Sequence, residues 1–346
     1  MEQPLRVINS AAPIRICDNG GWTDTWFAGH GQVFNVAVHP LVEVQIQVFP
    51  RARRSAAERV IIHAENFGDR YAPPLDGSGW GRHPLLEATI QCMGIPDDVA
   101  LEVSIFSQAP SGASTGTSAA VVVALVGALD CLTPGRLSPH QAACLAHSVE
   151  VDTLKQQCGV QDQLCAAYGG INYIDISNYP QATVSQLRVP DVVWWELERR
   201  LVLIYLGRSH SSSQVHEKVI QELEGAGPAG SQLQDLRLAA MQSRDAVCAG
   251  DFRGLGQAMI ANTEAQGNLL PDLISADARQ VIDIAREHGA LGWKVNGAGG
   301  EGGSLTLLCG PLSPIKRAMI CDIEQESDLF RNIPIRLSRR GLRTWE

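Results

Sequence analysis

The chain has 346 residues, 45% of them apolar and 19% charged, a balance typical of a globular protein large enough for two hydrophobic cores. Its net charge of −9 argues against nucleic acid or an anionic membrane as the main partner. Nine cysteines without a C-x-x-C pair indicate neither a zinc site nor a redox pair. With no signal-peptide pattern and no apolar run long enough to span a bilayer, we expect a cytoplasmic protein with reduced thiols.

The first third of the chain predicts mostly strands. Residues 5–17 alternate as a strand and end in a tight loop, 18–25, that contains two glycines and carries Asp24. Residues 33–48 predict a strand, a turn at Pro40 and a second strand. The other elements expected here are a strand at 60–64, a helix at 83–93 and a strand at 99–106.

A loop of Pro, Gly, Ser, Thr and Ala then leads into the uncharged apolar segment 119–129, which predicts a helix buried on all sides. Thr117 and Ser118 stand where this helix should begin and are good capping types. The start of such a helix presents free N–H groups and the positive end of its dipole, and therefore favours an anion such as phosphate. The loop by itself is equally consistent with a capped core helix and no ligand.

The rest of the chain alternates helices and strands. Ser138 and Pro139 predict a helix over 139–156 that carries Glu150 near its end, followed by a turn with Asp162. The remaining expected elements are a short helix broken at Gly169–Gly170 before a strand, a boundary region at 189–199, a strand at 201–205, a polar loop at 207–213, helices at 233–248, 252–265 and 276–288, a glycine-rich loop at 296–303 between strands, and a final helix and strand. This order predicts an α+β protein with two domains, 1–190 and 191–346.

Three polar glycine-rich loops, 18–25, 110–118 and 296–303, are spread over the whole length of the chain. Glycine allows a loop to approach a ligand closely because it has no Cβ. The second loop lacks the lysine of a Walker-type phosphate loop. The third returns to a strand at 305–308 instead of opening a helix, which argues against a dinucleotide fold and hence against a nicotinamide oxidoreductase.

In this order and spacing the loops resemble the three motifs of the GHMP kinases. AAPIRICDNGGWTDT resembles the first motif, PSGASTGTSAA the second and KVNGAGGEGG the third, so that the resemblance covers nearly the whole chain. It implies an ATP-dependent small-molecule kinase. It also implies an N-terminal domain like domain 2 of ribosomal protein S5 and a ferredoxin-like C-terminal domain, with the active site between them.

The resemblance also implies roles for individual residues. Asp162 would orient or deprotonate the acceptor hydroxyl, and Arg15 would pair with phosphate or steady Asp162, whereas Ser118 and Glu150 would ligate Mg²⁺, a cation that prefers oxygen. For Asp162 and Glu150 the alternative is a solvated helix carboxylate. The residues expected to hold the triphosphate of ATP are Pro110, Gly112, Ala113, Ser114, Thr115, Gly116, Thr117 and Ser118.

Two positions depart from the family pattern. The core of the second motif, 114–118, has one glycine fewer than usual, and the third motif has Glu301 where a glycine is common. A carboxylate near phosphates would weaken ATP binding, unless it lies outside contact range.

The substrate expectation comes from a closer resemblance within the family. GGWTDT and GVQDQLCAAYGGIN look most like the heptose 7-phosphate kinases and fucokinases, and GRSHSSSQVH like the heptose kinases. Arg208, His210 and Ser211–Ser213 would suit a sugar phosphate, although a plain helix cap is the alternative. The residues expected to contact the substrate are Gly21, Trp22, Thr23, Asp24, Gly169, Gly170, Arg208, His210, Gly297, Ala298 and Gly299.

The expected reaction is transfer of phosphate from MgATP to the anomeric hydroxyl of a heptose 7-phosphate, which gives the 1,7-bisphosphate. Two alternatives stay open: a fucokinase- or galactokinase-like enzyme for an unphosphorylated sugar, and a non-catalytic sensor of sugar and nucleotide. Whether the protein forms a homodimer is open as well.

Overall fold

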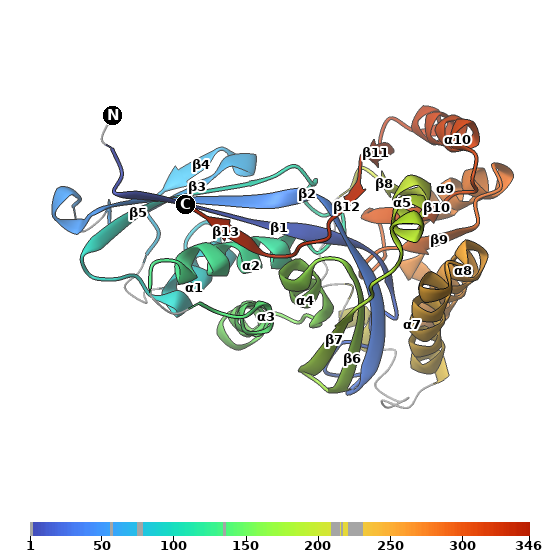
Figure 1. Ribbon diagram of the computed structural model, residues 1–346, viewed down its shortest axis with the longest axis horizontal. Coiled ribbons are helices and arrows are strands. Elements are labelled where there is room, and N and C mark those ends of the chain that lie inside the picture. The colour runs from blue at the N-terminus through green and yellow to red at the C-terminus, as the bar shows by residue number, and fades with distance from the viewer. Residues whose placement is uncertain are drawn as a thin grey trace.

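Two β-sheets organise the chain in the computed structural model, which describes residues 3–55, 58–74, 79–133, 136–208, 215, 217–220 and 231–346 (Figure 1). A nine-stranded sheet is built mainly from the first half of the chain, and a four-stranded sheet from the second half. In Figure 1 the helices α1–α4 lie along the large sheet, whereas α8–α10 gather around the small one.

The large sheet has the strand order β13-β1-β2-β5-β3-β4, and both β6 and β12 pair with β2 as well. Its neighbours are antiparallel except for β3 and β5. The strands are β1 (Arg6–Asn19), β2 (Gly31–Pro50), β3 (Val60–Ala64), β4 (Asp69–Tyr71), β5 (Val99–Ser107), β6 (Ile171–Asn178), β7 (Gln181–Gln186), β12 (Arg336–Leu337) and β13 (Arg343–Trp345).

The expected turn at Pro40 is wrong, because β2 is one continuous strand. Its register against β1 passes from Leu41 to Val38 while β1 advances by a single residue, so that His39 and Pro40 have no partner in β1. A bulge of this kind accommodates a proline, which has no N–H to donate to the neighbouring strand. The first half of β2 pairs with β6 and the second half with β5.

Four helices form a layer on the large sheet: α1 (Pro84–Met93), α2 (Thr117–Asp130), α3 (Pro139–Ser148) and α4 (Gln161–Tyr168). Among them α2 and α4 contact β1 and β2, whereas α1 packs on α2 and α3 packs on both α2 and α4. The buried helix expected at 119–129 is confirmed, since only Val121 of that segment is not fully buried. Ser138 caps α3 and forms a capping box with Gln141, as its sequence indicates. The α-helix does not reach residue 156, however; after Ser148 it continues as a π-helical turn, 149–153, that carries Glu150.

The small sheet is antiparallel and has the order β11-β8-β10-β9. Its strands are β8 (Leu201–Tyr205), β9 (Gly292–Val295), β10 (Ser304–Leu308) and β11 (Arg331–Ile333). Leu201 and Leu203 join one hydrophobic core and Val202 and Ile204 another, so both faces of β8 are covered. The helices in this part of the chain are α5 (Asp191–Arg200), α7 (Ser231–Ala249), α8 (Phe252–Leu269), α9 (Ala276–Glu287) and α10 (Ser313–Glu326). Of these, α7 packs on α8 and on β2 of the large sheet.

The boundary region expected at 189–199 is largely the helix α5. The division of the chain at residue 190 stays a prediction. The last two strands, β12 and β13, return to the large sheet and pair with β2 and β1. The C-terminal part of the chain is therefore not confined to the small sheet.

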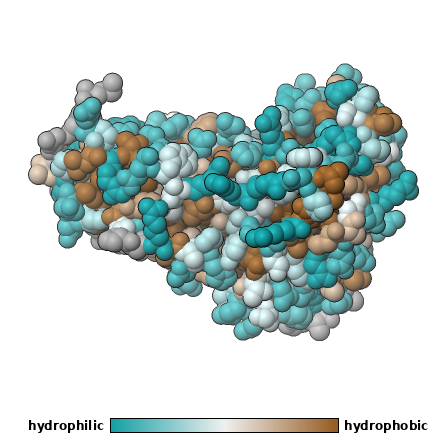
Figure 2. All heavy atoms as spheres, in the orientation of Figure 1, coloured by the Kyte–Doolittle hydropathy of each residue, from teal (hydrophilic) through white to brown (hydrophobic). Residues whose placement is uncertain are grey.

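The face of the molecule in Figure 2 is mostly hydrophilic, and its hydrophobic residues form small groups. Among the helices of the described residues, none is both long and apolar enough to cross a membrane.

Candidate active site

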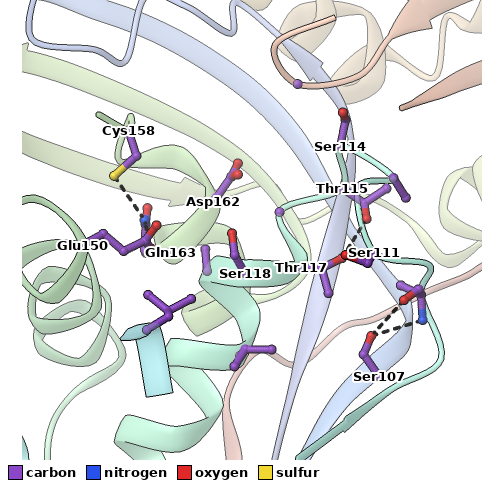
Figure 3. A pocket seen from close by; sticks show the side chains of 18 of the residues that line it. Ser107, Ser111, Ser114, Thr115, Thr117, Ser118, Glu150, Cys158, Asp162 and Gln163 are labelled. Carbon is purple, nitrogen blue, oxygen red and sulfur yellow. Dashed lines mark hydrogen bonds between the residues drawn. The ribbon is translucent and has the colours of Figure 1, made fainter. Parts of the chain in front are cut away.

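A cleft of about 800 Å³ brings together residues from all three glycine-rich loops. The second loop and the start of α2 form one wall, and the segment before α4 forms another (Figure 3). The predicted site residues that line the cleft are Arg15, Trp22, Asp24, Pro110, Gly112, Ala113, Ser114, Thr115, Gly116, Thr117, Ser118, Glu150, Asp162, Gly297 and Ala298.

The start of α2 differs from its expectation. The capping residue is Gly116, with φ of +68°, and Thr117 and Ser118 are the first two helical residues instead of the cap. Glycine has no side chain to accept from the N–H groups of the first turn. Residues 117–119 line the cleft, so their N–H groups and the helix dipole are available to an anion there.

Backbone contacts fix the loop that precedes α2. The Arg15 N–H donates to the Thr115 carbonyl at 2.9 Å, and the Arg15 guanidinium donates to the Ser114 carbonyl. Ser304, at the start of β10, donates its hydroxyl to the Ala113 carbonyl at 2.5 Å. The phosphate-binding candidate is thus held both by β1 and by the small sheet.

Asp162 and Arg15 form a two-point ion pair. Arg15 Nε lies 2.8 Å from Asp162 Oδ1, and a terminal nitrogen lies 3.2 Å from Oδ2. The arginine side chain is 5% exposed and the aspartate side chain 27%. Burial by itself lowers the pKa of Arg15, but the carboxylates of Asp162 and Asp18 outweigh it and raise that pKa above its usual value. A permanent cation thus orients a carboxylate that is still open to the cleft.

Glu150 is buried on the π-helical turn, and Gln163 Nε2 donates to its Oε1 at 2.8 Å. Burial raises the pKa of Glu150 to about 7. Figure 3 shows Glu150 and Gln163 on one side of the cleft and Ser118 at the start of α2. A carboxylate and a hydroxyl are donors that suit Mg²⁺. The described residues contain no cluster of three His, Cys, Asp or Glu that could hold a metal. Water and phosphate oxygens would complete the coordination of Mg²⁺ here.

Asp24 is buried at the end of the cleft beside α4. Its Oδ2 accepts from the Gln161 N–H at 3.1 Å, and burial raises the pKa of the carboxyl to about 6. Gly159 permits this arrangement, since a Cβ at that position would lie 2.0 Å from Asp24 Oδ2. Trp22 is buried and lines the same end. This corner offers a carboxylate beside a flat apolar wall.

Several predicted substrate contacts lie elsewhere in the structure and have packing roles. Thr23 is buried and donates to the Gly20 carbonyl at 2.7 Å. A Cβ on Gly169 would lie 2.2 Å from the Arg340 backbone, and the Gly170 N–H donates to the Ser338 carbonyl. Gly21, Gly169, Gly170 and Gly299 likewise do not line the cleft.

The structure does not bring Arg208 to the cleft either. Its side chain is 54% exposed, and its Nε lies 3.8 Å from Asp277. His210 and Ser211–Ser213 lie outside the described residues. Glu301 is exposed and does not line the cleft, which favours the expectation that this carboxylate stays out of contact range.

The end of the cleft away from Asp24 contains none of the predicted site residues outside the second loop. Asn66 exchanges two hydrogen bonds with Ser107, at 2.7 and 2.8 Å, which joins the segment after β3 to the end of β5. The Phe67 ring is 63% exposed and lies 5.1 Å from the His83 ring. No motif marks these residues; the one signal was an apolar aromatic residue between polar ones directly after a strand.

The chain is similar in sequence to known kinases. The family model described as "GHMP kinases N terminal domain" matches residues 85–170. A D-glycero-alpha-D-manno-heptose 7-phosphate kinase from Campylobacter jejuni is 24% identical over 248 residues, which are 71% of this chain and 71% of that protein. A mevalonate kinase from Thermococcus sibiricus is 30% identical over 256 residues, 70% of this chain and 68% of that protein.

Solved structures share the fold over nearly the whole chain. A D-glycero-D-manno-heptose 1-phosphate kinase from Bacteroides thetaiotaomicron has a TM-score of 0.74 at 19% identity and covers 98% of this chain and 99% of its own. A galactokinase from Lactococcus lactis, complexed with galactose, has a TM-score of 0.70 at 15% identity, with coverages of 98% and 95%. The expected α+β fold class is confirmed. This chain belongs to the GHMP kinases, a family of ATP-dependent phosphotransferases.

Proposed function

We propose that this protein is a sugar kinase that transfers the γ-phosphoryl group of MgATP to the anomeric hydroxyl of its substrate. The observation that carries the proposal is the Asp162–Arg15 pair, which lies in one cleft with the uncapped start of α2. Phosphoryl transfer needs charge neutralisation and a well-placed acceptor more than it needs covalent catalysis.

The nucleotide would lie along the second loop. Its phosphates would accept from the N–H groups of residues 117–119, and its base would reach the far end of the cleft, where Phe67 and His83 present their rings. Ser118 and Glu150 would hold Mg²⁺, which neutralises phosphate charge when bound. The pKa of about 7 for Glu150 fits a metal ligand, because a buried carboxylate without a cation is costly to ionise.

The acceptor would enter from the side of Asp24. Asp162 is oriented by Arg15 and is open to the cleft, so it would accept a hydrogen bond from the reacting hydroxyl. It would take the hydroxyl proton as the new P–O bond forms and the bond between the γ-phosphorus and ADP breaks. Arg15 holds both carboxylate oxygens of Asp162 in place for this task.

The charges at this end favour a polyhydroxy acceptor over a hydroxy acid. Asp24 and Asp162 are both carboxylates, and Arg15, the one arginine or lysine among the described residues that line this end, is already paired with Asp162. A carboxylate-bearing acceptor such as mevalonate would be repelled, whereas sugar hydroxyls can donate to Asp24 and stack their ring on Trp22.

Two sugars remain as candidates. A heptose 7-phosphate is supported by the relatives named as heptose phosphate kinases. An unphosphorylated sugar such as fucose or galactose is supported by the position of Arg208, which lies 3.8 Å from Asp277 and does not line the cleft, where Arg15 and Arg82 are paired with Asp162 and Asp69. The presence together of Ser118, Glu150 and Asp162 argues for an enzyme over a non-catalytic sensor.

The test is a panel of acceptors. The purified protein is incubated with MgATP and heptose 7-phosphate, fucose, galactose or mevalonate, and ADP release is followed against the Asp162→Ala variant as blank. We expect turnover with a sugar and none with mevalonate. Preferred turnover of mevalonate would contradict the proposed acceptor class, and ATP binding without any turnover would favour the sensor.

A further inference from the structure

A buried row of alternating charges lies behind the Asp162–Arg15 pair. Lys294 on β9 places its Nζ 3.4 Å from Asp18 Oδ1, and a terminal nitrogen of Arg15 lies 3.8 Å from Asp18 Oδ2. The side chains of Lys294 and Asp18 are 1% and 0% exposed. The row therefore runs from the small sheet through the end of β1 to the cleft. Asp162 has the most exposed side chain of the four.

The same two residues hold the third glycine-rich loop. Asp18 Oδ2 accepts from the Gly297 N–H at 2.9 Å, and Gln266 Nε2 donates to the Gly297 carbonyl at 3.2 Å. Lys294 Nζ donates in turn to Gln266 Oε1 at 3.2 Å. A Cβ on Gly297 would lie 3.3 Å from Arg15, so this loop packs directly against the guanidinium.

A buried ion pair is a poor means of stabilising a fold, because desolvation of both charges offsets much of their attraction. The Lys294–Asp18 pair also affects the position of Arg15. Arg15 stands between two carboxylates, Asp18 and Asp162, which compete for one guanidinium. Burial lowers the pKa of Lys294, and the Asp18 carboxylate opposes this shift. As an ammonium, Lys294 compensates Asp18, and this leaves the charge and the hydrogen bonds of Arg15 to Asp162.

We propose that Lys294 and Asp18 are positioning residues for phosphoryl transfer. Asp18 holds the Arg15 guanidinium from behind, and Lys294 keeps this hold weak enough that the guanidinium stays turned toward Asp162. The proposal rests on the proposed kinase function, because it assigns Lys294 and Asp18 an effect on the reacting hydroxyl that they exert only through Arg15 and Asp162.

Three variants separate this role from a merely structural one. Lys294→Met removes the ammonium and keeps the chain length, and it leaves Asp18 free to draw Arg15 away. We expect kcat to fall about 10- to 100-fold, as for a misplaced catalytic group, and the KM for ATP to change less than about 3-fold. Asp18→Asn keeps the shape and the acceptor for the Gly297 N–H, so a smaller loss is expected.

Of the three variants, the double variant Asp18→Asn/Lys294→Met distinguishes the positioning role from a structural one. It removes the uncompensated carboxylate, so its kcat should exceed that of Lys294→Met although it carries one more substitution. The matched control is Ser243→Ala, which deletes a buried 2.7 Å hydrogen bond from Asn19, at the same end of β1, without touching Arg15. It should lower Tm and leave kcat unchanged. A double variant no more active than Lys294→Met would overturn the proposal.

A crystal structure of Lys294→Met gives a readout that needs no turnover. The Arg15 guanidinium should lie closer to Asp18 than 3.8 Å and should have lost at least one of its two contacts with Asp162. An unmoved guanidinium would contradict the positioning role even if the wild type proved active. Conversely, a moved guanidinium in a protein that phosphorylates no acceptor would contradict the kinase proposal alone. If Lys294→Met does not fold, Asp18→Asn serves instead, and its Arg15 should keep both contacts with Asp162.

Discussion

The Asp162 carboxylate combines a fixed orientation with access to the cleft, because Arg15 holds it from one side and 27% of its side chain stays exposed. Asp162→Asn keeps the shape of the side chain and removes the base. We expect kcat to fall about 10²- to 10⁴-fold while the Kd for ATP stays within a few-fold. Steady-state kinetics and calorimetric titration with ATP measure the two quantities, and near wild-type turnover would refute the assignment.

The metal site makes a second prediction at this scale. Ser118→Ala and Glu150→Gln each remove an oxygen ligand or its charge, so each should raise the Mg²⁺ concentration needed for half-maximal activity. Asp152→Asn is the matched control, since Asp152 is an exposed carboxylate on the same π-helical turn. Unchanged Mg²⁺ dependence in both test variants would mean that the site has been misplaced.

Burial of the Asp24 carboxyl should lower the stability of the fold by an amount that depends on pH. Burial raises the pKa of Asp24 to about 6 in the folded protein, from an ordinary value of 3.8. Between pH 4 and 6, rising pH ionises the unfolded chain more than the folded one, so the free energy of unfolding falls in this window and stays lower above it.

Asp24→Asn removes this cost and keeps an acceptor for the Gln161 N–H. It should stabilise the ligand-free protein at pH 7.5 by about 2–3 kcal/mol, and by less at pH 4.5, while weakening sugar binding. Thermal unfolding at both pH values checks the sign. A variant less stable than the wild type at pH 7.5 would contradict the environment described for Asp24.

Single residues could be predicted from sequence where a motif names them. Arg15, Ser118, Glu150 and Asp162 come from separate segments and meet in one cleft. Lys294 could not be recognised as a partner of Asp18, because a buried ion pair between segments far apart leaves no periodic signal in either of them. The chemistry of its loop predicts Arg208 as a phosphate ligand but does not reveal which way the side chain points, and the structure places its Nε 3.8 Å from Asp277 instead of in the cleft.

At the scale of elements, the start of α2 depends on one glycine. Gly116 has φ of +68°, and an added Cβ would lie 3.1 Å from the Asp162 carboxyl carbon. Gly116→Ala should therefore turn the first N–H groups of α2 away and disturb Asp162, which raises the KM for ATP by about 10-fold and lowers stability by about 1 kcal/mol.

The control for this variant is Gly289→Ala. Gly289 has φ of +69° and no atom within 4 Å of the added Cβ, so it carries the same kind of backbone strain outside the site. It should lower stability alone. Equal effects of the two substitutions on the KM for ATP would argue against a special role for the α2 start.

Most elements follow from periodicity and capping signals, as α1, α3 and β8 illustrate. The exceptions have physical reasons. Pro40 reads as a turn, yet a bulge against β1 lets β2 continue through it. The π-helical turn after α3 continues a helical pattern, and no residue type distinguishes it from an α-helix.

At the scale of the whole molecule, the order of the three motifs predicted that distant parts of the chain meet. The third glycine-rich loop does so physically, since it contacts Asp18 at the end of β1 and leads into Ser304, which binds the second loop. The return of β12 and β13 to the large sheet was not predictable, because strands of two or three residues carry too little pattern to assign a partner.

The proposed transfer of phosphate to a sugar hydroxyl in this cleft can be followed by ³¹P nuclear magnetic resonance of the reaction mixture. With MgATP and the preferred sugar, we expect a new phosphate ester coupled to the proton at C1, formed in step with ADP and absent with Asp162→Ala. Release of inorganic phosphate without a sugar ester, or an ester formed equally well by Asp162→Ala, would contradict it.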